Sequence, residues 1–192
     1  MQKNIFQTYS QVFISSKKHD SRAIYAKRRL TLMKKLDSFC VLAGMPQDPG
    51  TEEAFAQTWT KFIQEPAFLY LTGVNQAGCY LVLDPSQNHS TLFVPKKDPF
   101  KEFWFGKRLG YLDGDHDVAQ LTGIDDIRPV EDLWKFVEEL ASKACAQRNP
   151  KLYAYAYYFE KFGGDHNKKF MVKLASKLRR FKMSIKSCAK LH

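Results

Sequence analysis

The sequence predicts an α/β protein, in which a mixed β-sheet is flanked by helices within one domain. Three observations lead to this fold class: helical patterns alternate with short apolar runs, two of these runs are separated only by a polar turn, and 192 residues are enough for one large core. The apolar fraction of 44% excludes a disordered chain. No run approaches the roughly 18 apolar residues of a membrane helix, so we expect no membrane partner.

The first half of the chain begins with a helix and continues into a hairpin. Residues 21–38 carry apolar side chains at mainly helical spacings, with Ser21 available as an N-cap. Residues 39–44, FCVLAG, form a continuous apolar run, which is typical of a strand buried on both faces. The runs at 79–84 and 90–95 are rich in β-branched and aromatic residues and enclose a polar turn, so we expect them to pair antiparallel.

The second half again alternates helices and strands. Its clearest element is a helix over 129–148, with apolar residues at helical spacing and acidic residues in its first turns. A last helix over 166–181 places four large apolar side chains on one face. The remaining expected elements are short helices near 99–104 and 115–122, with Asp98 and Asp115 as caps, and strands at 125–129 and 151–158.

The expected domain organisation is a single folded unit with two short flanks. Residues 1–20 form an N-terminal extension, residues 21–182 the domain, and residues 183–192 a C-terminal tail. The first residues contain no long apolar stretch followed by a small-residue cleavage site, which argues against a secretory signal. We therefore expect a cytoplasmic protein.

The net charge of +10 is concentrated near the C-terminus. Residues 165–192 contain nine Lys or Arg and one Asp, which leaves +2 for residues 1–164. One interpretation is a binding module whose last helix holds an acidic partner or nucleic acid. The alternative is that this helix face is only solvated or docks on another domain. We favour this alternative over the binding of nucleic acid. The residues of this possible basic face are Lys168, Lys169, Lys173, Lys177 and Arg180, continued by Arg179 and Lys182.

The sequence offers no catalytic residue and no metal site. Asp113, Asp115 and Asp117 imitate the start of an EF-hand loop, but Val118 stands where Gly is needed and Ile124 where Glu is needed. No His-x-x-x-His pair, Gly-x-Ser-x-Gly motif or phosphate loop occurs.

The four cysteines stand tens of residues apart without a Cys-x-x-Cys pair. Three of them lie in apolar surroundings, which favours buried free thiols over disulfides or a zinc site. They are Cys40, Cys79, Cys145 and Cys188.

Two linked motifs resemble a known family. Residues 62–73 read Phe-x-Gln-x-x-x-Phe-x-Tyr-Leu-Thr-Gly, and residues 91–98 read Thr-Leu-Phe-Val-Pro-Lys-x-Asp. Residues 102–110 continue with Glu-x-Trp-x-Gly-x-Arg-x-Gly. This order of motifs resembles the N-terminal domain of aminopeptidase P, the Xaa-Pro aminopeptidase branch of the creatinase and prolidase superfamily. Arg28-Arg29-Leu30 and Gly123-Ile124-Asp125 extend the likeness over most of the chain.

The resemblance implies a ribonuclease-H-like α/β fold without chemistry of its own. Whole members of the family carry a C-terminal pita-bread domain that holds two manganese ions and removes the residue preceding a proline. The implied partners are that catalytic domain, in cis or as a separate chain, a peptide with proline second, and further copies of this chain as a homo-oligomer. Alone, the chain should be inactive, because the dimetal domain is absent from it.

The resemblance also assigns residues. It implies that Trp104 forms part of the wall of a neighbouring subunit's substrate site. The other motif positions, expected to be structural, are Phe68, Tyr70, Gly73, Asp98, Gly106 and Arg108. One departure is that Ile63 stands where the family usually has Arg, so the contact that such an Arg makes cannot form here.

Overall fold

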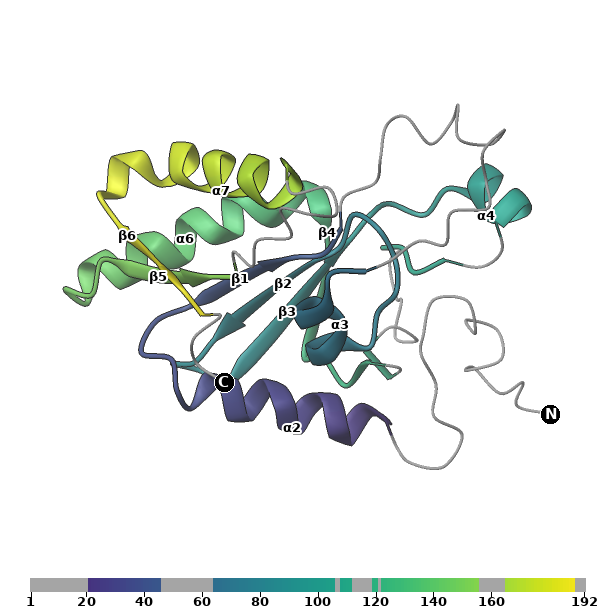
Figure 1. Cartoon of the computed structure of the whole chain (residues 1–192), viewed down its shortest axis with the longest axis horizontal. Helices are drawn as coiled ribbons and strands as arrows, with labels where there is room; N and C mark the ends of the chain where they lie inside the picture. Colours follow the sequence, from purple (N-terminus) through teal and green to yellow (C-terminus); the bar gives the residue numbers. More distant parts are fainter. Residues whose placement is uncertain are drawn as a thin grey trace.

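The computed structural model describes residues 21–45, 64–105, 108–111, 119–120, 122–155 and 165–188. Six strands form one mixed sheet in the order β4-β3-β2-β1-β5-β6 (Figure 1). The strands are β1 Cys40–Ala43, β2 Tyr80–Asp84, β3 His89–Val94, β4 Asp126–Pro129, β5 Lys151–Ala154 and β6 Ser184–Ser187. The described helices are α2 Ser21–Met33, α3 Pro66–Thr72, α4 Pro99–Phe105, α6 Leu133–Ala146 and α7 Asp165–Leu178, with 3-10 turns η2 Val130–Asp132 and η3 Arg179–Phe181.

The centre of the sheet is antiparallel and both flanks are parallel. Strand β2 pairs antiparallel with β1 on one side and with β3 on the other. The outer strands β4, β5 and β6 each run parallel to their inner neighbour. Parallel neighbours require crossover connections, and α6 and α7 occupy the connections that lead to β5 and β6.

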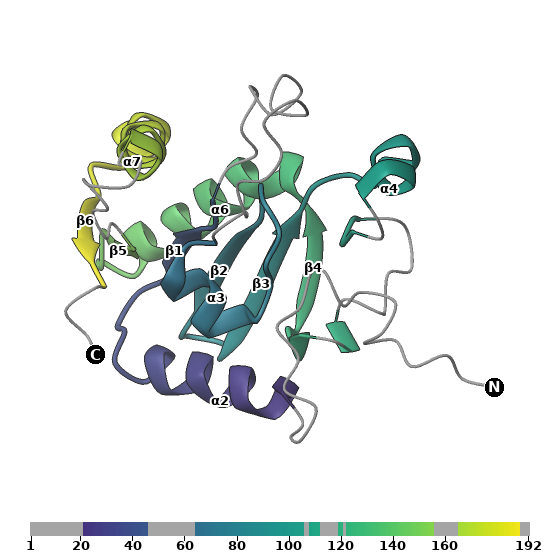
Figure 2. The same cartoon turned by 45° about the vertical axis from the view of Figure 1, so that its right-hand side comes forward.

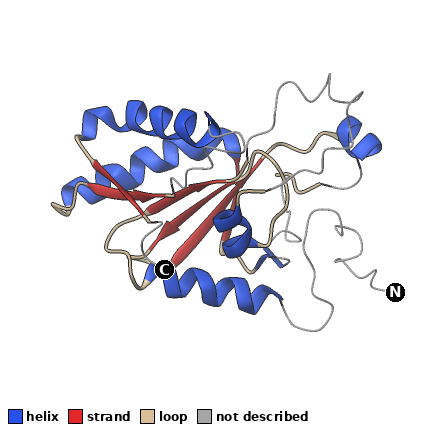
Figure 3. Cartoon of the chain, in the orientation of Figure 1, coloured by secondary structure: helices blue, strands red, loops and turns tan. Residues whose placement is uncertain are grey.

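Alternation of side chains along the strands divides the core into two halves. Cys40 and Leu42 of β1 point to one face of the sheet, and Val41 and Ala43 point to the other. The first half of the core contains Phe68 and other side chains of α2 and α3, and the second contains side chains of α6 and α7. Figures 2 and 3 show the resulting three layers, with the sheet between the two pairs of helices.

The predicted fold class is confirmed: the sheet is mixed and helices flank it. The buried strand at 40–43, the antiparallel pair of β2 and β3, and the helix that starts beside residue 99 agree with the sequence. The expected helix over 115–122 and the possible metal cluster at 113–117 fall largely outside the described residues, as does the extension 1–20.

Two elements are shorter than their patterns indicated. The first helix ends at Met33 rather than near residue 38, because the Asp37 carbonyl accepts a hydrogen bond from Asn149 and Ser38 Oγ donates to the Lys151 carbonyl at 2.6 Å. These bonds hold the chain against β5 in place of another helical turn. Strand β5 ends at Ala154, and Tyr155 after it is not in a strand, while residues 156–158 of the predicted strand lie outside the described residues.

Candidate functional site

The Tyr-Leu-Thr-Gly motif is the end of α3. Glu65 caps the helix start, where its carboxylate accepts the Phe68 N–H at 2.6 Å, and Pro66 occupies the first turn. Gly73 ends it in the left-handed conformation, with φ of 71°, and its N–H donates to the Leu69 carbonyl at 2.8 Å. Thr72 Oγ1 donates to the Phe68 carbonyl and accepts from the Val74 N–H. The motif therefore encodes a helix stop.

Two arginines of α2 bind the carbonyls at this helix end. Arg29, only 2% exposed, donates to the Leu71 carbonyl at 2.9 Å and also to the carbonyls of Thr122 and Gly123. Arg28 donates to the Tyr70 carbonyl at 3.0 Å, and its guanidinium lies 4.1 Å from the centre of the Tyr70 ring.

The burial of Arg29 has an electrostatic cost. Desolvation lowers the pKa of Arg29 to about 10, and the charge of Asp125 partly offsets this effect. The guanidinium stays charged near neutral pH, and each carbonyl bond to it is charge-assisted. The pair Arg28-Arg29 and the motif at 70–73 thus form one joint between α2 and α3.

Buried amides fix the loop that follows α3. Gln64 donates to the carbonyls of Val74 and Gln76 and accepts from the Met45 N–H at 2.7 Å. Gln76 in turn forms a two-way pair with the Leu109 backbone, with both bonds at 2.7 Å. Both amides are buried, and each one donates and accepts hydrogen bonds. A replacement that can only donate or only accept therefore leaves a buried backbone group without its hydrogen-bond partner.

The second part of the family-like motif surrounds a small polar cavity of about 110 Å³. Asp98 Oδ1 accepts the Phe100 N–H at 3.0 Å at the start of α4, and Glu102 accepts the Arg108 N–H at 3.0 Å. A β-carbon on Gly110 would lie 2.9 Å from the Lys97 Cα, so the backbone passes too closely there for a side chain. The cavity is lined by Gln76, Ala77, Pro95, Lys96, Lys97, Asp98, Glu102, Arg108 and Leu109.

Helix α4 carries a pair of exposed aromatic side chains. Phe100 is 72% exposed and Phe103 is 80% exposed. The helix stands away from the sheet, as Figures 1 and 2 show. Trp104 lies on the same helix, but its side chain falls outside the described residues, as does Gly106. We call Phe100 and Phe103 the α4 surface. Among the described residues it is the exposed apolar surface that lies nearest in sequence to Trp104, the residue predicted to form part of the substrate-site wall.

The sequence did not predict the exposure of Phe100 and Phe103 or the burial of Arg29. A signal for the first two was present in PFKEFWF, because two phenylalanines three positions apart lie on the same side of a short helix and together form an apolar surface. No comparable signal marked Arg29, since burial of a basic side chain depends on carbonyls supplied by residues far away in sequence.

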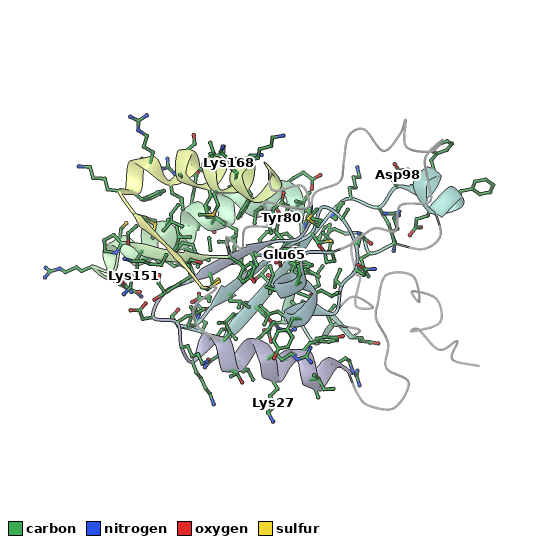
Figure 4. All side chains as sticks on the ribbon, viewed as in Figure 1. Lys27, Glu65, Tyr80, Asp98, Lys151 and Lys168 are labelled. Atoms are coloured by element: carbon green, nitrogen blue, oxygen red, sulfur yellow. The ribbon has the colours of Figure 1, made fainter. Side chains whose placement is uncertain are left out.

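In the structure, the residues of the predicted basic face fall into lysines that line a groove and an arginine that forms an ion pair. Lys168, Lys169, Lys173 and Lys177 line an open groove of about 420 Å³ on α7, together with Val172 and Ser176. Lys173 lies over the Trp134 ring at 5.1 Å, and Arg180 forms an ion pair with Glu138. Figure 4 places Lys168 in the layer opposite Lys27 of α2, so this groove and the α2–α3 joint lie on different faces of the sheet.

The described residues contain no group of three or more His, Cys, Asp or Glu side chains that could hold a metal ion. The resemblance assigns the two manganese ions to a C-terminal catalytic domain and none to these residues, and we derive no step through them. None of the helices described is long and apolar enough to cross a membrane.

Comparisons with known proteins identify the family of this chain. The sequence profile of the aminopeptidase P N-terminal domain matches residues 25–148. Xaa-Pro aminopeptidase 3 of Rattus norvegicus is 37% identical over 89 residues, which are 43% of this chain and 17% of the relative. Xaa-Pro dipeptidase of Homo sapiens is 28% identical over 134 residues, which are 66% of this chain and 24% of the relative.

The fold matches solved structures as well. The zinc-substituted aminopeptidase P of E. coli in complex with product superposes with a TM-score of 0.59 at 22% identity, over 86% of this chain and 36% of that one. The match thus spans about a fifth of the curated relatives and about a third of the solved chain. The profile covers the motif residues and both sides of the α2–α3 joint, and the chain belongs to the aminopeptidase P N-terminal domain family.

Proposed function

We propose that this chain serves as the non-catalytic N-terminal domain of a manganese-dependent Xaa-Pro aminopeptidase. In this role it makes contacts between subunits and supplies part of the wall of a substrate site. The family membership is the observation that carries the proposal, since the relatives that match are named as Xaa-Pro peptidases. One of them is named as an aminopeptidase and another as a dipeptidase.

The α4 surface supports the subunit contact. An exposed pair of phenylalanines on a helix that stands away from the core is costly in water and is relieved when another surface covers it. Trp104 follows Phe103 directly and is assigned to the substrate-site wall, where its flat ring can pack on a peptide. Asp98 and the Glu102–Arg108 bond hold this helix at the rim of the polar cavity.

The first experiment measures the size of the native polypeptide. An antibody raised against this domain should detect, in cells of the source organism, a species of roughly twice this length, as expected when a second domain of ordinary size is attached. A species of 192 residues would leave a separate catalytic chain as the required partner.

Two assays on the pure chain complete the test. The pure chain in buffer that contains manganese should release no N-terminal residue from a peptide with proline second, and measurable release overturns the non-catalytic assignment. Light scattering should show self-association that weakens in the double variant Phe100→Ser, Phe103→Ser. A matched control is Val172→Ser, which removes an exposed apolar side chain from α7 instead.

A second candidate function is a binding module that uses the α7 groove for an acidic partner. The observation that favours it is the clustering of four lysines around one open groove. Binding of an acidic polymer such as heparin should weaken steeply with salt and be lost on Lys168→Glu with Lys177→Glu. The control Lys27→Glu makes one such charge reversal on the opposite layer. If this single variant loses as much binding as the double variant, or if no binding occurs in dilute salt, this candidate is removed.

A further inference from the structure

Two cysteines from distant parts of the chain meet in the core. The Sγ atoms of Cys40 and Cys188 lie 3.7 Å apart, although 148 residues separate them in sequence. Cys40 opens the central strand β1, and Cys188 is the residue that follows the edge strand β6. Their side chains are 0% and 2% exposed, so they face each other rather than solvent.

The two residues differ in how firmly they are held. Cys40 is paired with Leu83 of β2 on one side and with Tyr153 of β5 on the other. Cys188 lies beyond the last residue of β6, where its N–H donates to the Ala154 carbonyl at 3.2 Å. A disulfide has an S–S distance of about 2.05 Å, so the sulfurs must approach by roughly 1.7 Å. Rotation of the side chains and a small shift at Cys188 can supply this approach.

The electrostatic environment gives the two sulfurs different roles. Burial raises the pKa of Cys40, whose thiol donates a hydrogen bond to the Cys188 sulfur. This bond lowers the pKa of Cys188, while burial and the nearby Glu65 carboxyl act in the opposite direction. Cys188 is therefore the sulfur that more readily becomes the thiolate, which is the reactive form of a cysteine.

We propose that Cys40 and Cys188 form a reversible disulfide when the chain meets hydrogen peroxide. The Cys188 thiolate attacks a peroxide oxygen, the O–O bond breaks, and the hydroxide that leaves takes up the proton that Cys188 lost. The Cys40 sulfur then attacks the Cys188 sulfenic acid, the S–S bond forms, and a second water leaves with the Cys40 proton. Two thiols thus lose two electrons, and hydrogen peroxide is reduced to two waters.

This bond ties the chain behind β6 to the middle of the sheet. In the reduced protein Cys188 is held against the sheet by packing and by the bond from its N–H to the Ala154 carbonyl, without a covalent link to β1. In the oxidised protein the point at which the chain leaves the domain is fixed against β1. The oxidation state of the two thiols thus determines whether the residue after β6 is covalently linked to β1.

Peptide mapping of the whole chain tests the proposal. After mild hydrogen peroxide treatment and blocking of free thiols, trypsin under non-reducing conditions should yield the peptide of residues 36–61 joined to that of residues 187–190. Dithiothreitol should separate them. The melting temperature of the oxidised chain should be higher by about 5–10 °C, because the bond closes a long loop in the unfolded chain.

Variants separate this bond from general oxidation. Cys188→Ser should abolish the joined peptide, whereas Cys145→Ser, which changes a partly exposed cysteine elsewhere, should leave it intact. The mapping of the unmodified chain does not depend on whether a variant folds. Oxidation that yields only single modified cysteines, or a bond to Cys79 or Cys145, overturns the proposal.

Discussion

Gly73 lies directly against the ring of Tyr25. A β-carbon built on Gly73 would stand 2.4 Å from Cε2 of Tyr25, closer than two carbon atoms can approach. The glycine is also in the left-handed conformation that ends α3. Two independent demands, one from the helix stop and one from the neighbouring helix, therefore meet at the last position of the Tyr-Leu-Thr-Gly motif.

Gly73→Ala should lower the free energy of unfolding by about 3 kcal/mol, since the new methyl group adds overpacking against Tyr25 to backbone strain. Gly78→Ala is the control, with a similar φ of 75° but its nearest neighbour, Pro95, at 3.3 Å. It should cost only about 1–2 kcal/mol. Urea denaturation of both variants gives the comparison. Equal losses would show that the Tyr25 contact is not what requires glycine.

Arg29→Met should destabilise the chain by about 2–4 kcal/mol, because it leaves the carbonyls of Leu71 and Thr122 buried without their charged donor. Arg28→Met is the control on the same helix. It removes an exposed guanidinium that donates to the Tyr70 carbonyl, and it should cost less than about 1 kcal/mol. Thermal unfolding followed by circular dichroism measures both. A larger loss from Arg28→Met would contradict the joint described here.

The buried carboxyl of Glu65 should make stability depend on pH. Burial raises its pKa above the ordinary value of 4.5, against the hydrogen bond from the Phe68 N–H. Between the ordinary pKa and the raised pKa of the folded chain, the folded chain binds more protons than the unfolded chain. The free energy of unfolding therefore falls as pH rises through this interval. Glu65→Gln keeps an acceptor for the Phe68 N–H and removes the ionisation.

The measurement is the urea midpoint of both proteins from about pH 4 to pH 8. The wild-type chain should lose stability relative to Glu65→Gln as the pH rises above 4.5, the ordinary value for this carboxyl. The exposed Glu131→Gln is the matched control and should leave the slope unchanged. Parallel curves for wild type and Glu65→Gln would rule out a perturbed carboxyl.

Gln76→Glu should destabilise the chain by about 2–4 kcal/mol, because the buried side chain gains a charge and loses the donor to the Leu109 carbonyl. Gln87→Glu makes the same change at an exposed position of the β2–β3 turn and should cost less than about 0.5 kcal/mol. Calorimetry of the two variants gives the difference. Similar melting temperatures would mean that the Leu109 segment is not held by Gln76.

The strands that the sequence predicted are those in which a run of apolar residue types indicates burial. Val41, Val82 and Phe93 lie in apolar runs, and all three are buried in strands. Strand β6 lacked such a signal, because an edge strand with one inward residue, Ile185, and mainly exposed neighbours has no clear apolar alternation. Its pairing with β5 is set by backbone bonds after α7 has returned the chain to the sheet.

The site was predictable as a motif but not as a set of contacts. Gly73 and Phe68 stood out by resemblance, and Asp98 also by its position before a helix. The partners of Arg29 and Gln76 depend on tertiary structure, since each reaches backbone groups more than 30 residues away. The side chain of Trp104 lies outside the described residues, and its role stays a prediction.

The bonds of Arg29 also set an order of events during protein synthesis. Its guanidinium reaches the carbonyl of Leu71, 42 residues ahead, and those of Thr122 and Gly123, 93 and 94 residues ahead. We expect the growing chain to hold α2 only loosely until Gly123 has emerged from the ribosome, although β1, β2 and β3 are by then complete. The contacts of α2 therefore form in two stages, the first when Leu71 is available and the second only after residues 122 and 123.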